Sequence, residues 1–383
     1  MKESELPKEY IPTQVEAKWQ KVWESKQIYR FKKDHRPNFV IDTPPPFTSG
    51  ELHMGHVLNF VFIDIVARYN RMRGYNVFCP QGWDCHGLHT ELRVEAVHNI
   101  TKHNVSREQF KKYCIEWTER SIEKMKAQMK TIGYSADWSY EYRTMDPEYI
   151  KRVQLTFIDF YNRGLVYLAE HPVNWCPKCE TAIANAEVEY ETRTTTLNYV
   201  KFLINGETIP IATTRPELLC ACVAVAINPN DNRYKNLAGK KAIVPIYNRE
   251  VPIIIDPDVD PNFGTGIVMI CTFGDKQDVE WKYRHNLPII KAIDPKGIMG
   301  KAAGKYENLS IDECKKRIIQ DLQKDLLIEK IESLEQNVAV HERCGTPIEF
   351  LVTSQWFVKT REFKEQVIAA GKEIKWTPNH MIQ

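Results

Sequence analysis

Apolar residues recur at helical spacing in three segments of the first part of the chain. Residues 10–30 carry apolar side chains on one face of a helix, which predicts an amphipathic helix. A more apolar helix is expected over residues 55–72. A third is expected over residues 106–133, because Ser106 and Gln109 have the spacing of a capping box at its start.

Short apolar runs flank the second of these helices. Residues 39–41 precede it and residues 76–79 follow it, and both are rich in β-forming side chains. The order strand, helix, strand is that of a βαβ unit, which implies a parallel sheet. Ligands of such sheets bind at the carboxyl ends of the strands. The fold class predicted for this part is therefore α/β.

The pattern changes after residue 172 and becomes strand-rich from about 195 to 335. Gly, Pro, Asn and Asp separate the apolar runs, as is typical of a compact β-rich domain. The expected strands are NYVKFLI, ETIPIATT, CVAVAI, KAIVPI, VPIIIDPDV, TGIVMICT and LPIIKAI. A charged helix is expected around 311–325, and the last stretch from residue 355 is predicted to be helical.

The composition is that of a globular protein, with 43% hydrophobic and 27% charged residues in 383. No apolar run is long enough to span a bilayer, and the charged start MKESELPKEY is not a secretory signal. Ten cysteines without such a signal favour reduced thiols or a metal site over disulfides. We therefore expect a cytoplasmic protein without a membrane partner. A net charge of +2 does not itself indicate a nucleic-acid partner.

Two pairs of soft ligands have the spacing of a metal site. Cys176 and Cys179 form one pair, and His341 and Cys344 form the other. Three thiolates and one imidazole fit a closed, tetrahedral structural Zn²⁺ site. A single C-x-x-C could instead be a redox pair, so the prediction of zinc depends on both pairs meeting in space.

Two histidines, His53 and His56, stand where the first strand gives way to a helix. A helix N-terminus carries a partial positive charge and unpaired N–H groups, so it suits an anion. Imidazoles there can bind phosphate oxygens. Surface histidines, core histidines and metal ligands are the alternatives that the residues alone leave open.

The segment PPPFTSGELHMGHVLNFV resembles the HIGH-type loop of class I aminoacyl-tRNA synthetases, and GWDCHGLHTE resembles a second fingerprint of their branched-aliphatic subgroup. The resemblance implies that His53 and His56 bind the phosphates of ATP, with Mg²⁺, and stabilise the transition state of adenylate formation. It also implies that Asp84 holds the amino group of the amino acid. Three further residues would line the amino-acid pocket: Pro45, Pro46 and Trp356.

The β-rich region resembles the editing domain of the same subgroup. ATTRPE at 212–217 resembles its Thr-rich strip, and FGTGIVMICTFGDKQD resembles its second strip. By this resemblance hydroxyls position a water against an ester and a carboxylate fixes the ammonium of a mischarged amino acid. The implied editing residues are Thr213, Thr214, Arg215, Asp275 and Asp278. The sequence departs from the usual second strip at Met269, Cys271 and Gly274.

The resemblance covers nearly the whole chain and is nearest to archaeal-type valyl-tRNA synthetases. It implies a partial Rossmann-like (HUP-type) parallel sheet with an inserted β-rich editing domain and a small zinc knuckle. The expected parts are an N-terminal helix region (1–35), the first half of the Rossmann-like catalytic domain (36–171), the zinc knuckle and linker strands (172–194 and 336–350), the editing domain (195–335) and a truncated return to the catalytic domain (351–383).

The implied function is that of a valine–tRNA ligase, with valine, ATP and tRNA(Val) as partners and with hydrolytic editing of threonyl-tRNA. No KMSKS-like run occurs, so we expect an N-terminal portion of a ligase that forms valyl-adenylate poorly alone. A C-terminal half on another chain would then be a further partner. The alternatives are a stand-alone editing hydrolase, a fragment of an isoleucyl-tRNA synthetase, and a tRNA-binding module without activity.

Overall fold

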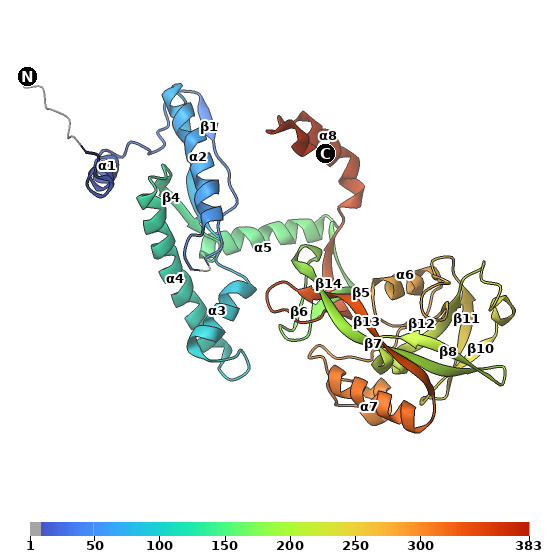
Figure 1. The fold of residues 1–383 in the computed structure, drawn as a ribbon. Coiled ribbons are helices and arrows are strands. Elements are labelled where there is room, and N and C mark those ends of the chain that lie inside the picture. Colours follow the sequence, from blue (N-terminus) through green and yellow to red (C-terminus); the bar gives the residue numbers. More distant parts are fainter. Residues whose placement is uncertain (1–8, 49, 383) are drawn as a thin grey trace, which may run out of the picture. The chain divides into compact units, whose positions relative to one another are not determined.

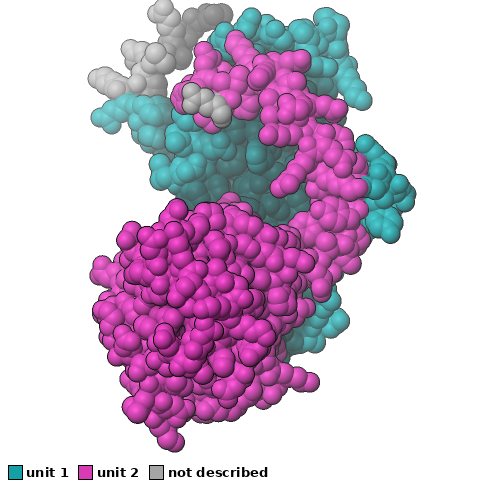
Figure 2. Space-filling view, turned by 90° about the vertical axis from the view of Figure 1, so that its right-hand side faces the viewer, with its two compact units in different colours: residues 1–164 teal, residues 165–383 magenta. Residues whose placement is uncertain are grey.

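The computed structural model describes residues 9–48 and 50–382 and divides the chain into two compact units, residues 1–164 and residues 165–383 (Figure 2). Residues 1–8 of the predicted N-terminal region, position 49 beside the histidine loop and residue 383 lie outside this description. Among the described helices, none combines the length and the apolar character that crossing a membrane requires.

The first unit alternates helices with short strands (Figure 1). Its elements are α1 (Pro12–Lys26), β1 (Asn38–Val40), α2 (Met54–Met72), β2 (Asn76–Phe78), β3 (Pro80–Trp83), α3 (Leu88–His98), α4 (Arg107–Thr131), β4 (Asp137–Arg143) and α5 (Pro147–Asn162). The three helices predicted from periodicity are confirmed as α1, α2 and α4. Ser106 caps α4 by accepting a hydrogen bond from the Gln109 amide at 3.2 Å. Helices α3 and α5 were not predicted.

The strands of the first unit pair in parallel, as the βαβ pattern predicted. β1 pairs with β2, and β3 pairs with β4. Just after β3, an isolated parallel bridge joins Asp84 to Phe47: the Asp84 amide donates to the Pro46 carbonyl at 2.9 Å and the Thr48 amide donates to the Asp84 carbonyl at 3.1 Å. Prolines therefore serve here as acceptors only, which suits a residue that lacks an N–H group.

The core of the first unit lies between α2, α4 and the short strands. Ile122, Met125 and Met129 of α4 are each 0% exposed and recur at three- and four-residue intervals, so they form one buried stripe. Trp83 at the end of β3 packs in the same cluster and is also fully buried. The burial of these side chains fixes the strand ends from which Asp84 emerges.

The second unit is rich in β-strands (Figure 1). Its strands are β5 (Val166–Cys176), β6 (Thr181–Ala182), β7 (Val188–Ile204), β8 (Glu207–Thr213), β9 (Cys222–Ile227), β10 (Lys241–Val244), β11 (Arg249–Ile255), β12 (Ile267–Cys271), β13 (Ile328–His341) and β14 (Glu349–Val358). Its α-helices are α6 (Lys276–Arg284), α7 (Ile311–Lys324) and α8 (Lys364–Glu373). Its 3₁₀ turns are Asn185–Glu187, Pro216–Ala221, Lys235–Leu237, Lys301–Tyr306, Arg361–Phe363 and Asn379–Ile382.

Seven strands form the main sheet, in the order β12-β9-β11-β10-β7-β13 with β8 paired to β7. The long antiparallel ladder of β7 and β13 runs from the pair Val188 and His341 to the pair Val200 and Ile328. A second long ladder joins β14 to β5, with Glu349 opposite Trp175. These two ladders bring the segments around residues 176 and 341 together, although they are far apart in sequence.

Two expectations for the second unit were wrong. Residues 287–293 form no strand apart from a single bridge from Ile293 to Met299. Pro288 lacks an amide donor, and the backbone of Ile290 is hydrogen-bonded to the Thr272 hydroxyl in place of a neighbouring strand. Residues 355–358 are not helical but complete β14, because they pair with the start of β5.

Candidate functional site

The two histidines of the loop form the N-terminus of α2. His53 is the N-cap residue, and its Nδ1 accepts hydrogen bonds from the amides of Gly55 at 3.1 Å and His56 at 3.4 Å. In return the His53 amide donates to Nδ1 of His56 at 3.3 Å. The two rings stack with centroids 3.8 Å apart. The pair is therefore a reciprocal cap built from imidazoles.

The loop remains open to solvent. His53 is exposed and His56 is half-buried, so the rings do not point into the apolar core. Partial burial and the neighbouring His53 ring lower the pKa of His56. A lowered pKa leaves this imidazole mostly neutral near pH 7, and a nearby anion would raise the pKa and favour the charged form. The site therefore suits an anion, because the negative charge of the anion would favour protonation of His56.

Asp84 follows the carboxyl end of β3 and forms an isolated parallel bridge with Phe47. Its Oδ1 is 3.4 Å from the Thr144 hydroxyl, which also accepts a hydrogen bond from the Cys85 amide at 2.8 Å. Its backbone is bonded to Pro46 and Thr48. Asp84, Pro45 and Pro46 are all half-buried. The structure thus places the predicted carboxylate and the proline segment at one sheet edge.

Trp356 belongs to the second unit, where it lies on β14 opposite Leu168 and is 51% exposed. It is therefore not a buried core tryptophan. Its role in the amino-acid pocket stays a prediction.

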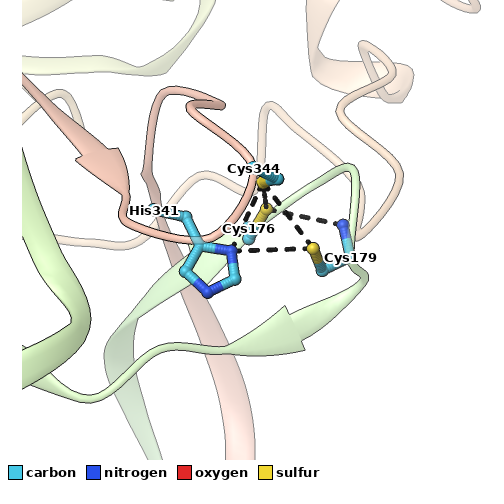
Figure 3. Close-up of side chains that lie close together, drawn as sticks. All are labelled: Cys176, Cys179, His341 and Cys344. Atoms are coloured by element: carbon cyan, nitrogen blue, oxygen red, sulfur yellow. Dashed lines mark hydrogen bonds between the residues drawn. The ribbon is translucent and has the colours of Figure 1, made fainter. Parts of the chain in front are cut away.

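The four predicted metal ligands meet at one point of the second unit (Figure 3). Their ligand atoms all lie within 4.8 Å of one another. Cys344 Sγ lies 3.5 Å from Cys176 Sγ, 3.7 Å from Cys179 Sγ and 3.3 Å from His341 Nδ1. Cys179 Sγ lies 3.6 Å from the same nitrogen. Each of the four residues is thus in direct contact with at least one ligand of the other pair.

These distances fit a tetrahedral ion. Zn–S bonds of about 2.3 Å and Zn–N bonds of about 2.0 Å place the ligand atoms about 3.8 Å (S to S) and about 3.5 Å (S to N) apart. The observed separations lie close to both values, and they are too long for a disulfide, whose sulfurs are about 2 Å apart. The cluster is therefore suited to hold one metal ion through three sulfurs and Nδ1 of His341.

Arg215, in the Thr-rich strip, is held by three different segments. Its Nε donates to Glu217 at 2.8 Å, one terminal nitrogen donates to Glu349 at 2.8 Å, and the other donates to the Gly274 carbonyl at 3.3 Å. Glu217 and Glu349 are 2% and 4% exposed. The guanidinium thus offers its charge to two buried carboxylates while it spans the two strips.

The threonines precede Arg215 at the end of β8. The Thr213 hydroxyl accepts a hydrogen bond from the Arg215 amide at 3.0 Å, and the side-chain amide of Asn198 donates to the Thr213 carbonyl at 3.3 Å. Thr213 is buried, and Thr214 is half-buried. The strip is therefore rigid at Thr213, and the Thr213 hydroxyl still has a proton to donate.

Asp278 lies in the first turn of α6 and reaches back to the second strip. Its carboxylate accepts hydrogen bonds from the amides of Gly274 at 2.8 Å and Cys271 at 3.2 Å. Burial raises the pKa of Asp278, the nearby Asp275 raises it further, and the two amides oppose that rise. Asp275 is exposed and caps α6 by accepting from the Asp278 amide at 2.9 Å. Through Gly274, the Asp278 carboxylate is linked to Arg215.

Two carboxylates of this cluster were missed as site residues from the sequence. Glu217 belongs to the ATTRPE segment itself, so its proximity to Arg215 was a local signal. Glu349 is 134 positions away from Arg215 and carries no local signal. Only the β5–β14 ladder places it there.

Two hollows accompany these sites. One of about 340 Å³ in the second unit is lined by Leu218, Phe273 and Phe350, which are adjacent in sequence to the Arg215 partners Glu217, Gly274 and Glu349. The other, about 590 Å³, lies between α1, α4 and the amino end of β4. Ligands of parallel sheets bind at carboxyl ends, so the second hollow is not at the expected edge.

Comparison with known proteins places the chain in a family. The family described as tRNA synthetases class I (I, L, M and V) matches residues 18–383. The chain therefore belongs to the class I tRNA synthetases. This agrees with a mixed α/β fold whose parallel strand pairs end beside the histidine loop.

The curated relatives are more specific. The chain is 53% identical to the valine–tRNA ligase of Methanothermobacter thermautotrophicus over its whole length, and 54% identical to that of Pyrococcus furiosus over 98% of its length. It spans about 44% and 43% of the length of these two proteins. A solved complex of Agrobacterium radiobacter K84 LeuRS with tRNA and LeuAMS matches 88% of this chain and 52% of that chain, with 22% identity and a TM-score of 0.44.

Proposed function

We propose that the chain is the part of a valine–tRNA ligase that activates valine with ATP and edits mischarged tRNA(Val) in the cytoplasm. The observation that carries the proposal is the identity of about 53% to curated valine–tRNA ligases along the whole chain. The proposal includes the division predicted from the sequence, in which residues 36–171 belong to the catalytic domain and residues 195–335 form the editing domain.

In activation, the first unit supplies the ATP and amino-acid contacts. His53 and His56 bind the triphosphate of ATP, with its Mg²⁺, at the N-terminus of α2, where the helix dipole favours an anion. Asp84 pairs with the ammonium of valine, because a half-buried carboxylate holds a cation better than water does. Pro45 and Pro46 line the pocket for the aliphatic side chain.

In editing, the second unit hydrolyses threonyl-tRNA(Val). Asp278 holds the ammonium of the threonyl group, and Thr213 and Thr214 orient a water toward the ester carbonyl. The water oxygen bonds to the carbonyl carbon, the bond to the ribose oxygen breaks, and that oxygen keeps a proton from the water. Threonine and free tRNA are released. Such a site is needed because an aliphatic pocket rejects an added hydroxyl only by about 100-fold.

The metal proposed for the Cys176, Cys179, His341 and Cys344 cluster is Zn²⁺. Three sulfurs and one imidazole nitrogen at tetrahedral separations favour zinc over oxygen-seeking ions. All four positions of the ion are taken by protein ligands, so its role is structural.

Editing is tested by the deacylation of threonyl-tRNA(Val). Asp278→Asn removes the carboxyl group that pairs with the ammonium, and we expect it to slow deacylation roughly 100-fold. Asp260→Asn is the matched control, because Asp260 only accepts from the Asn262 amide in an exposed turn. Equal rates for wild type and Asp278→Asn would overturn the proposed role of Asp278.

Valine-dependent exchange of pyrophosphate into ATP tests activation, with isoleucine as the competing amino acid. Isoleucine-dependent exchange exceeding that with valine would favour an isoleucyl enzyme. A second candidate, a stand-alone editing hydrolase, is favoured by the position of the Arg215 cluster, Asp278 and the metal ligands in the same compact unit. Deacylation without any exchange, under conditions where a full-length relative exchanges, would support that candidate.

A further inference from the structure

The guanidinium of Arg215 is the meeting point of three segments that are distant in sequence. Its three bonded nitrogens reach Glu217 in its own strip, Gly274 in the second strip and Glu349 in β14. A planar guanidinium has its donors in fixed directions, so a partner that moves turns the whole group. The position of Glu349 therefore helps to set where Arg215 lies.

Glu349 lies close to metal ligands both along the chain and across the β5–β14 ladder. Along the chain it comes five residues after Cys344, and across the β5–β14 ladder it stands opposite Trp175, the neighbour of Cys176. The turn from His341 to Thr346, which contains Cys344, is closed by the His341 amide donating to the Thr346 carbonyl at 2.9 Å. Glu349 begins β14, and its partner across the ladder lies on β5. Cys344 precedes β14 and Cys176 ends β5, so one ligand of each pair lies close to Glu349 along the chain or across the ladder.

From Arg215 the connection continues to Asp278. Arg215 donates to the Gly274 carbonyl, and the Gly274 amide donates to the Asp278 carboxylate at 2.8 Å. There is little space at this point, since a Cβ at Gly274 would lie 2.8 Å from Asp278 Oδ2 and 3.3 Å from the Leu218 side chain. A displacement of Arg215 that moves Gly274 is therefore passed to the Asp278 carboxylate.

We propose that Glu349 is a positioning residue for the editing site, through which metal binding at the Cys/His cluster orients Arg215, Gly274 and Asp278. The inference rests on the proposed editing function. It adds that the metal sets the geometry of the hydrolytic site, in addition to stabilising the strands around it. Because coupling between two sites is reciprocal, removal of Glu349 should also weaken the hold on the metal.

The first test measures metal retention without using activity. Zinc-loaded wild type, Glu349→Gln and Glu349→Asp are mixed with a colorimetric zinc chelator, and the rate of zinc release is followed. Both variants should release zinc roughly tenfold faster, because residues that orient metal ligands affect affinity to this extent. The control is Glu332→Gln, a half-exposed carboxylate of β13 bound to Lys330 and Tyr199, which should leave release unchanged. Wild-type release rates in both Glu349 variants would overturn the coupling.

The second test observes Arg215 directly in the zinc-loaded proteins. The Nε–Hε group of Arg215 donates to the buried Glu217 carboxylate, which slows its exchange with water and allows its nitrogen-15 NMR signal to be resolved. This signal should shift or disappear in both Glu349 variants and stay unchanged in Glu332→Gln. An unshifted Arg215 signal in Glu349→Gln would contradict the positioning role.

The third test is kinetic and uses the same zinc-loaded proteins. Glu349→Gln keeps the shape of the side chain, and Glu349→Asp keeps its charge but is too short to reach Arg215. Positioning predicts that both variants lower kcat for deacylation roughly 10- to 100-fold. A purely structural ion pair predicts lower thermal stability with an unchanged kcat. If wild type itself does not deacylate threonyl-tRNA(Val), the proposed function fails, while zinc release and the Arg215 signal still decide the coupling.

Discussion

The histidine loop of the first unit and the Arg215 cluster of the second unit are built in opposite ways. The two histidines are exposed or half-buried, and the hydrogen bonds among His53, Gly55 and His56 link residues within three positions of one another. The cluster is buried, and its partners come from segments up to 134 positions apart. A local arrangement of this kind needs only a helix start, whereas the buried cluster exists only when several ladders have formed.

This difference should appear in energetics. An exposed cap contributes about 1 kcal/mol and is little affected by distant changes. A half-buried cation that pairs with two buried carboxylates is costly to remove, because the carboxylates that remain have lost their water. Variants in the second unit should therefore have larger and more pH-dependent effects on stability than variants in the loop.

Removal of the metal should have the largest effect on this comparison. Cys176→Ser takes away one of four ligands and frees the strands that place Glu349, so we expect the second unit to lose about 4 kcal/mol or more. Metal content and urea unfolding measure this loss. Cys114→Ser, a half-buried cysteine outside the cluster, is the control. Full stability of Cys176→Ser without bound metal would show that the knuckle does not depend on an ion.

Replacement of Arg215 should come next. Arg215→Met leaves Glu217 and Glu349 buried without a cation, at a cost of about 3 kcal/mol. Burial already raises the pKa of Glu349 and Arg215 opposes that rise, so without Arg215 the folded variant would bind more protons and its stability would fall as the pH rises. Urea unfolding at about pH 5 and about pH 8 should give the larger deficit at about pH 8. Lys241→Met, which breaks an exposed pair with Glu250, should cost under about 1 kcal/mol at either pH.

The same contrast explains how much of these sites could be predicted from the sequence. The loop histidines, the Thr-rich strip and both metal pairs are local patterns, so all could be proposed before the fold was known. Glu349 could not, because a glutamate at the start of a strand has no local feature that marks it as buried. The failure at residues 287–293 has a similar cause, since an apolar run does not show that a distant threonine hydroxyl takes the place of a strand. Tertiary contacts decided both cases.

Asp256 directly follows β11, and its replacement should have a smaller effect on stability. The replacement tests whether a buried charge in the second unit always destabilises the fold. Asp256 is fully buried, and it accepts from Arg284 at 2.8 Å and from His285 at 2.6 Å. Hydrogen bonds from His285, from the Asp258 amide and from Arg284 outweigh burial and lower its pKa from 3.8 to about 2.

A lowered carboxyl pKa contributes stability above the unfolded value, and this is lost as the pH falls through the folded value. Asp256→Asn should therefore cost about 2 kcal/mol at neutral pH and make unfolding less dependent on pH between about 4 and about 2. Asp258→Asn, which alters a half-exposed partner of the same Arg284, is the matched comparison in acid unfolding. An equal loss in both variants would contradict the importance of burial.

The smallest effect on stability is expected in the loop, where it separates capping from phosphate binding. His53→Ala removes the acceptor for two amides of α2 and should cost about 1 kcal/mol, whereas asparagine is a good N-cap and His53→Asn should restore most of it. Urea unfolding of the first unit measures this difference, and calorimetry measures ATP binding. If His53 binds phosphate, both variants bind ATP weakly although only one is destabilised. Wild-type ATP affinity in His53→Asn would reduce the histidine to a helix cap.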